Sequence, residues 1–183
     1  VISIMAGVRI KNIAKITGQK RIIRTMPNLP LQIGEGTIGW HTNKKLFKKS
    51  ELKEIETLLS FFGKKFYVKK EDLIDSITAI SGSGPAYVFL FIEALIQSAM
   101  QLGLSKEQSR QIVMQTISGS LAYIDSQENN VNLKELIARV RSKKGTTEAA
   151  LNTINIENFY NKWIKATNAA RKRAGELSSH EVN

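Results

Sequence analysis

The stretch LIDSITAISGSGPAYVFLFIEALIQSAMQLG, residues 73–103, decides the fold of this chain. Residues 81–85 join two apolar segments through two glycines and a proline, which suit the start of a helix better than its interior. We therefore predict a long helix over 86–102, buried on nearly all sides in a core or an interface. Its strongly polar positions are Glu93, Gln97, Ser98 and Gln101. The apolar run falls short of the roughly 20 residues that a membrane span needs, and Glu93 interrupts it.

Composition sets limits on the class of protein. With 183 residues, 42% hydrophobic and 23% charged, the chain has the balance of a globular protein of one or two domains. It has no cysteine and only two histidines, His41 and His180, so we expect no metal site. The net charge of +11 favours anionic partners. Because the lysines are spread out with few aromatic residues between them, we interpret them as a solvated surface and expect no nucleic-acid groove, although a basic nucleic-acid module stays an alternative.

The first 70 residues alternate strands and helices. Strands are predicted at 1–5, 21–26, 36–42 and 65–68. One helix is predicted at 10–17. A second is predicted between the third and fourth strands, with Ser50 as its N-cap and Gly63 at its C′ position. The first strand should be buried. Because a helix separates the first two strands, they should be parallel and joined by a right-handed crossover. No G-x-G-x-x-G loop follows any strand, so this is at most half of a dinucleotide-binding sheet.

Everything after Glu71 follows a helical pattern. Ser105 opens one helix with the spacing of a capping box, and further helices are expected at 133–140, 146–154 and 156–177, with a frayed tail over 178–183. The fold class is therefore α/β followed by all-α, an incomplete Rossmann-like sheet with a C-terminal helical bundle. We place the domain boundary between residues 1–70 and 71–183.

One loop stands out as a candidate anion site. Residues 142–147, Ser-Lys-Lys-Gly-Thr-Thr, combine a predicted helix start, hydroxyl groups and two cations, which together can receive a carboxylate or phosphate. An ordinary helix cap with solvated lysines fits the same residues. No Ser/His/Asp set or acid/base pair of carboxylates is evident, which is compatible with hydride transfer because the cofactor then carries the chemistry.

Taken together, these motifs identify a family resemblance over almost the whole length. The pieces are Ser3–Val8, Arg24–Pro30, Gly34–Gly36, Glu71–Asp75, Ser81–Tyr87 and Gly145–Thr147. In this order they resemble pyrroline-5-carboxylate reductase, the last enzyme of proline biosynthesis. The resemblance implies an N-terminal Rossmann domain and a helical domain that interlocks in a dimer, with decamers in many members.

The resemblance also implies an activity and a cofactor. The family reduces 1-pyrroline-5-carboxylate to L-proline with NAD(P)H, so we expect NADP, with NAD as the alternative. We further expect a cytoplasmic homodimer formed through the C-terminal helices, with a decamer as a larger alternative and without nucleic-acid or membrane partners. The interface role predicted for the helix at 86–102 agrees with this.

Site residues carry over from the family by motif. The residues expected to bind the cofactor are Ile4, Met5, Ala6, Pro27, Asn28 and Glu71. The residues expected to bind the substrate are Ser142, Gly145, Thr146 and Thr147. Among these, the resemblance places the Thr147 hydroxyl near the imine, which makes it the catalytic candidate.

Two departures from the family pattern bear on activity. The chain begins after the family's first strand and Gly-rich loop, so we expect an N-terminally truncated protein that binds NADPH poorly by itself. Lys143 and Lys144 stand where the family's Ser-Pro-Gly-Gly-Thr-Thr loop has proline and its first glycine. A glycine whose backbone needs positive φ or close approach to the substrate is not freely replaced by lysine. An alternative is therefore a catalytically impaired relative that acts only as a dimerising helical protein.

Overall fold

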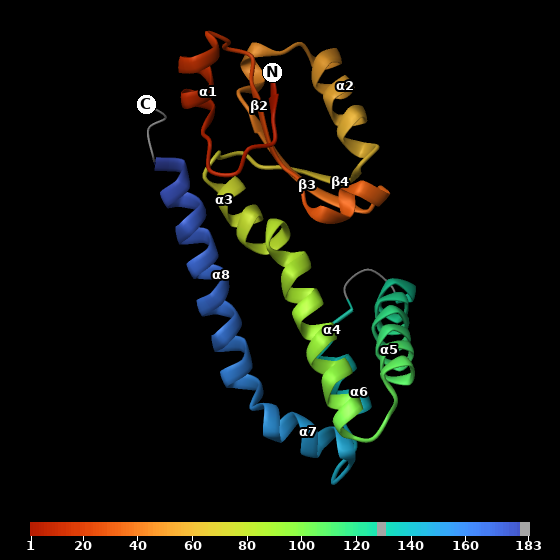
Figure 1. Ribbon diagram of the computed structural model, residues 1–183. Coiled ribbons are helices and arrows are strands. Elements are labelled where there is room, and N and C mark those ends of the chain that lie inside the picture. Colours follow the sequence, from red (N-terminus) through yellow and green to blue (C-terminus); the bar gives the residue numbers. More distant parts are fainter. Residues whose placement is uncertain (128–130, 180–183) are drawn as a thin grey trace. The chain divides into compact units, whose positions relative to one another are not determined.

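The computed structural model describes residues 1–127 and 131–179 (Figure 1). These residues form two compact units. The sheet unit comprises residues 1–87 and the chain from Ile164 onward, and the helical unit comprises residues 88–163. We describe each unit by itself. The boundary at residue 70 between two functional domains stays a prediction.

The sheet unit is built on four strands in the order β1-β2-β3-β4. They are β1 (Ile2–Ser3), β2 (Ile23–Met26), β3 (Gly36–Thr42) and β4 (Gly63–Tyr67). β1 and β2 are parallel, β2 and β3 are antiparallel, and β3 and β4 are parallel. The parallel first pair and the bounds of the third strand confirm the sequence prediction. The buried first strand is wrong in part, because only Ser3 is buried while the flanking apolar side chains are exposed.

Two helices accompany the sheet before residue 70. α1 (Ile10–Thr17) ends, as predicted, at Gly18, which adopts the left-handed conformation with φ of 67°. α2 (Lys49–Ser60) begins earlier than predicted, with Lys48 instead of Ser50 as N-cap. The reason is Glu51, whose carboxylate accepts the Lys48 N–H at 2.7 Å. Gly63 is not the C′ residue of this helix but the first residue of β4, with φ of 133°. Short 3-10 turns cover Leu29–Ile33 and Lys44–Leu46.

The sheet is covered on both faces. On one face Ile23, Ile38 and Trp40 pack against Leu59 of α2, and this is the hydrophobic core. The opposite face meets α3 (Leu73–Ile77), where Gly39 of β3 lies so close to Ile77 that a Cβ atom at residue 39 would collide with it. Arg24 is paired with His41 in the sheet register and therefore belongs to this second face.

The glycine-rich segment does not break the chain into two helices. α3 runs through a π-helical turn (Thr78–Gly82) into α4 (Gly84–Gln101). The turn is closed by the Ser83 N–H, which donates to the Thr78 carbonyl at 2.9 Å. Residues Leu73–Gln101 thus form 29 residues of continuous helix, which by length and composition alone is enough to cross a membrane. The sequence prediction of a shorter apolar helix starting after residue 85 is corrected in this respect.

The second part of this helix, the apolar α4, is exposed within one chain. No residue of α4 is buried, and the side chains of Val88, Phe89, Leu90 and Phe91 are each at least half exposed. The prediction of burial on nearly all sides therefore does not hold within a single chain. The physical reason is that the helical unit alone does not supply enough neighbouring surface to cover all faces of the helix.

The remaining helices follow the sequence closely. They are α5 (Lys106–Ser126), α6 (Leu133–Val140), α7 (Thr146–Ile154) and α8 (Ile156–Ser179). The capping box of α5 is confirmed, because the Ser105 hydroxyl accepts the Gln108 N–H and the Gln108 side chain accepts the Ser105 N–H. The frayed tail is wrong at its start, since α8 includes residues 178 and 179 and Ser178 is buried. The rest of that tail, with His180, lies outside the described residues.

Candidate functional site

Two parallel strands place five of the predicted cofactor residues at one edge of the sheet. Ile4, Met5 and Ala6 follow β1, and Pro27 and Asn28 follow β2. The two strands are parallel, with Ser3 opposite Arg24, so the segments that follow them leave the sheet at the same edge. The carboxyl ends of parallel strands are where α/β sheets bind ligands. The geometry therefore brings together the residues that the sequence predicted as a group.

An apolar hollow opens at this edge. Its lining consists of Ile2, Ile4, Thr25, Pro27, Leu31, Ile38, Leu58, Leu59 and Phe62. Ile4 is about two-thirds exposed and Met5 is half exposed. The Asn28 side chain accepts the Thr37 N–H at 2.8 Å and so fixes the start of β3 against the end of β2. The loop after β2 is thus held in place by its own asparagine.

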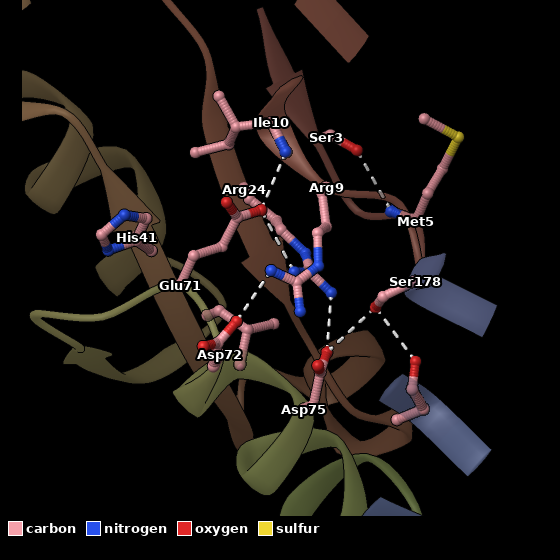
Figure 2. Close-up of polar contacts among 12 residues, drawn as sticks. Ser3, Met5, Arg9, Ile10, Arg24, His41, Glu71, Asp72, Asp75 and Ser178 are labelled. Carbon is pink, nitrogen blue, oxygen red and sulfur yellow. Dashed lines mark hydrogen bonds and ion pairs between the residues drawn. The ribbon is translucent and has the colours of Figure 1, made fainter. Parts of the chain in front are cut away.

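The sixth predicted cofactor residue, Glu71, belongs to a polar cluster on the second face of the sheet (Figure 2). Its Oε1 atom accepts the Ile10 N–H at 2.8 Å and lies 3.2 Å from Nη1 of Arg24. Glu71 therefore caps helix α1, whose N-cap residue Arg9 makes no side-chain hydrogen bond of its own to the helix. The Glu71 side chain is one-fifth exposed, so its structural contacts leave part of the carboxylate accessible.

Arg24 is the centre of this cluster. Its side chain is fully buried, and its Nη2 atom pairs with Oδ1 of Asp75 at 2.9 Å. The Ser178 hydroxyl lies 3.3 Å from the same Oδ1 atom and 3.0 Å from the Ala174 carbonyl, so the end of α8 joins the cluster (Figure 2). Within the described chain the Nε atom of Arg24 has no hydrogen-bond partner. One buried cation thus links β2, α3 and the cap of α1.

The cluster adjoins the turn that follows β1. The Met5 N–H donates to the Ser3 hydroxyl at 3.3 Å, and the Thr25 hydroxyl donates to the Ser3 carbonyl at 2.9 Å. Gly7 has φ of 70° and a Cβ atom there would lie 2.5 Å from that of Leu177. Sequence reasoning did not single out Arg24, Asp75 or Ser178. The available signal was an arginine inside the short apolar strand Ile23–Met26.

The predicted substrate loop lies in the helical unit between α6 and α7. Gly145 is the N-cap of α7, and its N–H donates to the Ser142 carbonyl at 3.0 Å. A Cβ atom at residue 145 would collide with the Ser142 hydroxyl, which would have to turn away. Thr146 and Thr147 are the first two residues of α7, and no side chain caps this helix at Gly145. Ser142, Gly145, Thr146 and Thr147 are brought together by this turn.

Lys144, at the position of the loop's first glycine in the resemblance, has a backbone conformation that favours glycine. It has φ of 59°, the left-handed region that a lysine adopts at a cost. Its N–H donates to Oε2 of Glu148 at 2.8 Å, while Arg141 donates to Oε1 of Glu148 through Nε at 3.3 Å and Nη2 at 3.0 Å. The Lys144 N–H, and then the Arg141 guanidinium, lower the pKa of the Glu148 carboxyl. Of the two reasons for a glycine at this position, positive φ is the one that the backbone of Lys144 shows.

The two halves of the candidate site belong to different units. The predicted cofactor residues Ile4, Met5, Ala6, Pro27, Asn28 and Glu71 all lie in the sheet unit. The predicted substrate residues lie in the helical unit. Among residues 1–127 and 131–179, no three His, Asp, Glu or Cys side chains gather as a set of metal ligands.

Comparisons with known proteins agree with this architecture. The model of the family described as pyrroline-5-carboxylate reductase dimerisation matches residues 71–177. The pyrroline-5-carboxylate reductases of Pseudomonas aeruginosa and Aquifex aeolicus are each 36% identical to the chain over 97% of its length. The chain spans 64% and 66% of the length of these two relatives.

Solved structures show the same likeness. The Plasmodium falciparum pyrroline carboxylate reductase with NADP bound matches with a TM-score of 0.88 at 32% identity, over 97% of this chain and 67% of the other. A pyrroline-5-carboxylate reductase of Coxiella burnetii matches with a TM-score of 0.87 at 38% identity, over 98% of this chain and 66% of the other.

The open mixed sheet is part of a Rossmann-like fold, and the helices that follow it form a helical dimerisation domain. The class of protein is therefore one that joins a Rossmann-like sheet to a helical dimerisation domain. More narrowly, the chain belongs to the pyrroline-5-carboxylate reductase family.

Proposed function

We propose that this chain provides the substrate loop and the dimerisation helices of a reductase that converts 1-pyrroline-5-carboxylate to L-proline with NADPH. NADPH is proposed because the Plasmodium falciparum relative is described with NADP bound. NAD is the alternative cofactor. Residues 1–70 are proposed as the C-terminal portion of a Rossmann-like NAD(P)-binding domain. Residues 71–183 are proposed as the domain for dimerisation and substrate binding. We propose a cytoplasmic location.

One observation carries the proposal. The parallel pair β1 and β2 puts Ile4, Met5 and Ala6 at the same sheet edge as Pro27 and Asn28, where α/β sheets bind nucleotide cofactors. These are the segments that carry the resemblance to the family in the sheet unit. On the second face of the sheet, the Glu71 carboxylate caps α1 by accepting the Ile10 N–H. The backbone at the sheet edge is thus proposed to lie against the nicotinamide cofactor.

The substrate half of the site has the chemistry of a carboxylate receptor. The start of α7 offers backbone N–H groups and the positive end of the helix dipole. Hydroxyl groups of Ser142, Thr146 and Thr147 lie in the same turn. We propose that this turn holds the carboxylate of the substrate and that Thr147 lies nearest the imine. A bound nicotinamide cofactor would supply the hydride for the imine carbon, and the balancing proton on the ring nitrogen would come from solvent.

The dimer is proposed from exposed apolar surface in the helical unit. Val88, Phe89, Leu90 and Phe91 of α4 are at least half exposed, as are Ile112, Leu121 and Tyr123 of α5. Monomeric soluble proteins rarely leave so much apolar surface uncovered. The length of the helix Leu73–Gln101 also suits a membrane, but the matching family model is one of dimerisation. We therefore propose a homodimer through these helices, with a decamer as a larger assembly of such dimers.

An impaired relative without chemistry is the second candidate, motivated by Lys143 and Lys144. Against it, Lys144 adopts the left-handed backbone that the family glycine would permit, so the loop keeps its course. The turn also retains Gly145 and both threonines. The reductase is therefore the better supported function.

The test uses a hybrid and two matched variants. The N-terminal third of the Pseudomonas aeruginosa relative is joined ahead of Val1, and NADPH or NADH oxidation is followed with 1-pyrroline-5-carboxylate. The hybrid should form L-proline. Thr147→Ala should reduce turnover by about tenfold or more, the loss of one polar contact to the reacting group. Thr153→Ala in the same helix should not, because its hydroxyl only bonds to the Ala149 carbonyl. A folded, dimeric hybrid without turnover, beside an active Pseudomonas relative, would favour the impaired alternative.

A further inference from the structure

One carboxylate connects three parts of the substrate loop. Glu148, the third residue of α7, uses Oε2 to accept the Lys144 N–H at 2.8 Å. Its Oε1 atom receives two N–H groups of Arg141, which lies directly after α6. Both carboxylate oxygens of Glu148 thus accept hydrogen bonds, one from Arg141 before the loop and the other from Lys144 within it.

The loop needs an external constraint at Lys144. Its φ of 59° lies in the region that L-residues with a Cβ atom avoid, and such a conformation persists only where surrounding contacts hold it. A glycine would adopt it freely. In this chain the hydrogen bond from the Lys144 N–H to Glu148 supplies a contact that depends on that backbone conformation.

The charge of Glu148 poses a second requirement. A carboxylate near the start of α7 is favourable for the helix dipole but would repel an incoming carboxylate ligand. Arg141 lies against this carboxylate with two N–H groups, so the pair is close to neutral. The positive character of the helix start then stays available to a ligand.

We propose that Arg141 and Glu148 are positioning residues of the substrate loop. Glu148 fixes the Lys144 backbone, and Arg141 neutralises Glu148, so that the Ser142 and Thr147 hydroxyls are held ready for a carboxylate. This inference rests on the proposed function, because it assigns the loop a carboxylate ligand. It names two residues that flank the loop in which Lys143 and Lys144 stand at the proline and glycine positions.

The experiment compares three arginine variants of the chain. Arg141→Ala removes the pair, Arg141→Lys keeps the charge, and Arg139→Ala removes an equal charge two residues away. Arg139 forms no ion pair within the described residues. The two readouts are hydrogen exchange of the Lys144 amide and the Kd for L-proline from an NMR titration.

Arg141→Ala should speed exchange at Lys144 and weaken L-proline binding by about three- to fivefold, the range for a partly exposed ion pair. Arg141→Lys should recover much of the binding, and Arg139→Ala should match the wild type. Equal effects of Arg141→Ala and Arg139→Ala would show only a general charge effect and overturn the proposal. Unchanged exchange and Kd in Arg141→Ala would overturn it as well, while the proposed function would stand. A wild-type loop that binds no L-proline would refute the proposed carboxylate site and this role together.

Discussion

Replacing Arg24 by methionine tests whether the buried cluster holds the sheet unit together. The Arg24 side chain is 0% exposed and pairs with Asp75, which is 7% exposed, at 2.9 Å. Methionine keeps much of the volume but leaves two carboxylates without their cation. Removing one partner of a buried pair costs about 3–5 kcal/mol, because the remaining charge is uncompensated. In a chain of this length that loss should lower the Tm by about 10 °C.

Arg9 provides a matched control. Its Nη1 atom lies 2.8 Å from Oδ1 of Asp72, as close as the buried pair, but the two side chains are 33% and 64% exposed. An exposed pair of this kind contributes less than about 1 kcal/mol. Arg24→Met and Arg9→Met are to be unfolded in urea at one protein concentration, since the proposed dimer would make the transition concentration-dependent. The two cations differ in burial and in the number of carboxylates they pair with, which is two for Arg24 and one for Arg9.

A double variant separates loss of a cation from loss of packing. Arg24→Met together with Asp75→Asn removes one of the stranded charges, so it should recover part of the stability lost in Arg24→Met. If Arg24→Met costs no more than Arg9→Met, burial does not set the strength of this cluster. The reasoning would then be refuted.

Further predictions concern the sheet, the loop and the dimer. Gly39→Ala should cost about 1–3 kcal/mol in urea unfolding, because its Cβ atom meets Ile77. Lys144→Gly should relieve the left-handed backbone and raise stability by about 1 kcal/mol or less, seen as a higher Tm. Because the pKa of Glu148 is lowered in the folded chain, its carboxylate stabilises the fold above the ordinary glutamate pKa, and this stabilisation is lost as the pH falls through the lowered pKa. In melts at several pH values, Glu148→Gln should therefore make the Tm fall less steeply on the acid side. Leu90→Glu should turn the proposed dimer into a monomer in sedimentation at micromolar concentration, whereas an unchanged mass would place the interface elsewhere.

The sequence by itself determined the order of the strands and main helices and the bounds of several of them. α6 and β3 have the predicted bounds, and the capping box at Ser105 forms as expected. These features depend on local hydrogen bonds, side-chain period and backbone preference, which are written in neighbouring residues. At Lys144 the glycine of the family loop indicated either positive φ or close approach to the substrate, and the φ of 59° identifies the first.

The tertiary structure alone decided which polar residues are buried and which apolar ones are not. Ser178 lies 103 positions from its partner Asp75, and no local pattern distinguishes it from a frayed end. Arg24 is fully buried because α3 and α8 close over it, whereas α4 is exposed because its own unit offers too little covering surface. Burial is set by elements that are distant in sequence, so it becomes visible only once the chain has folded.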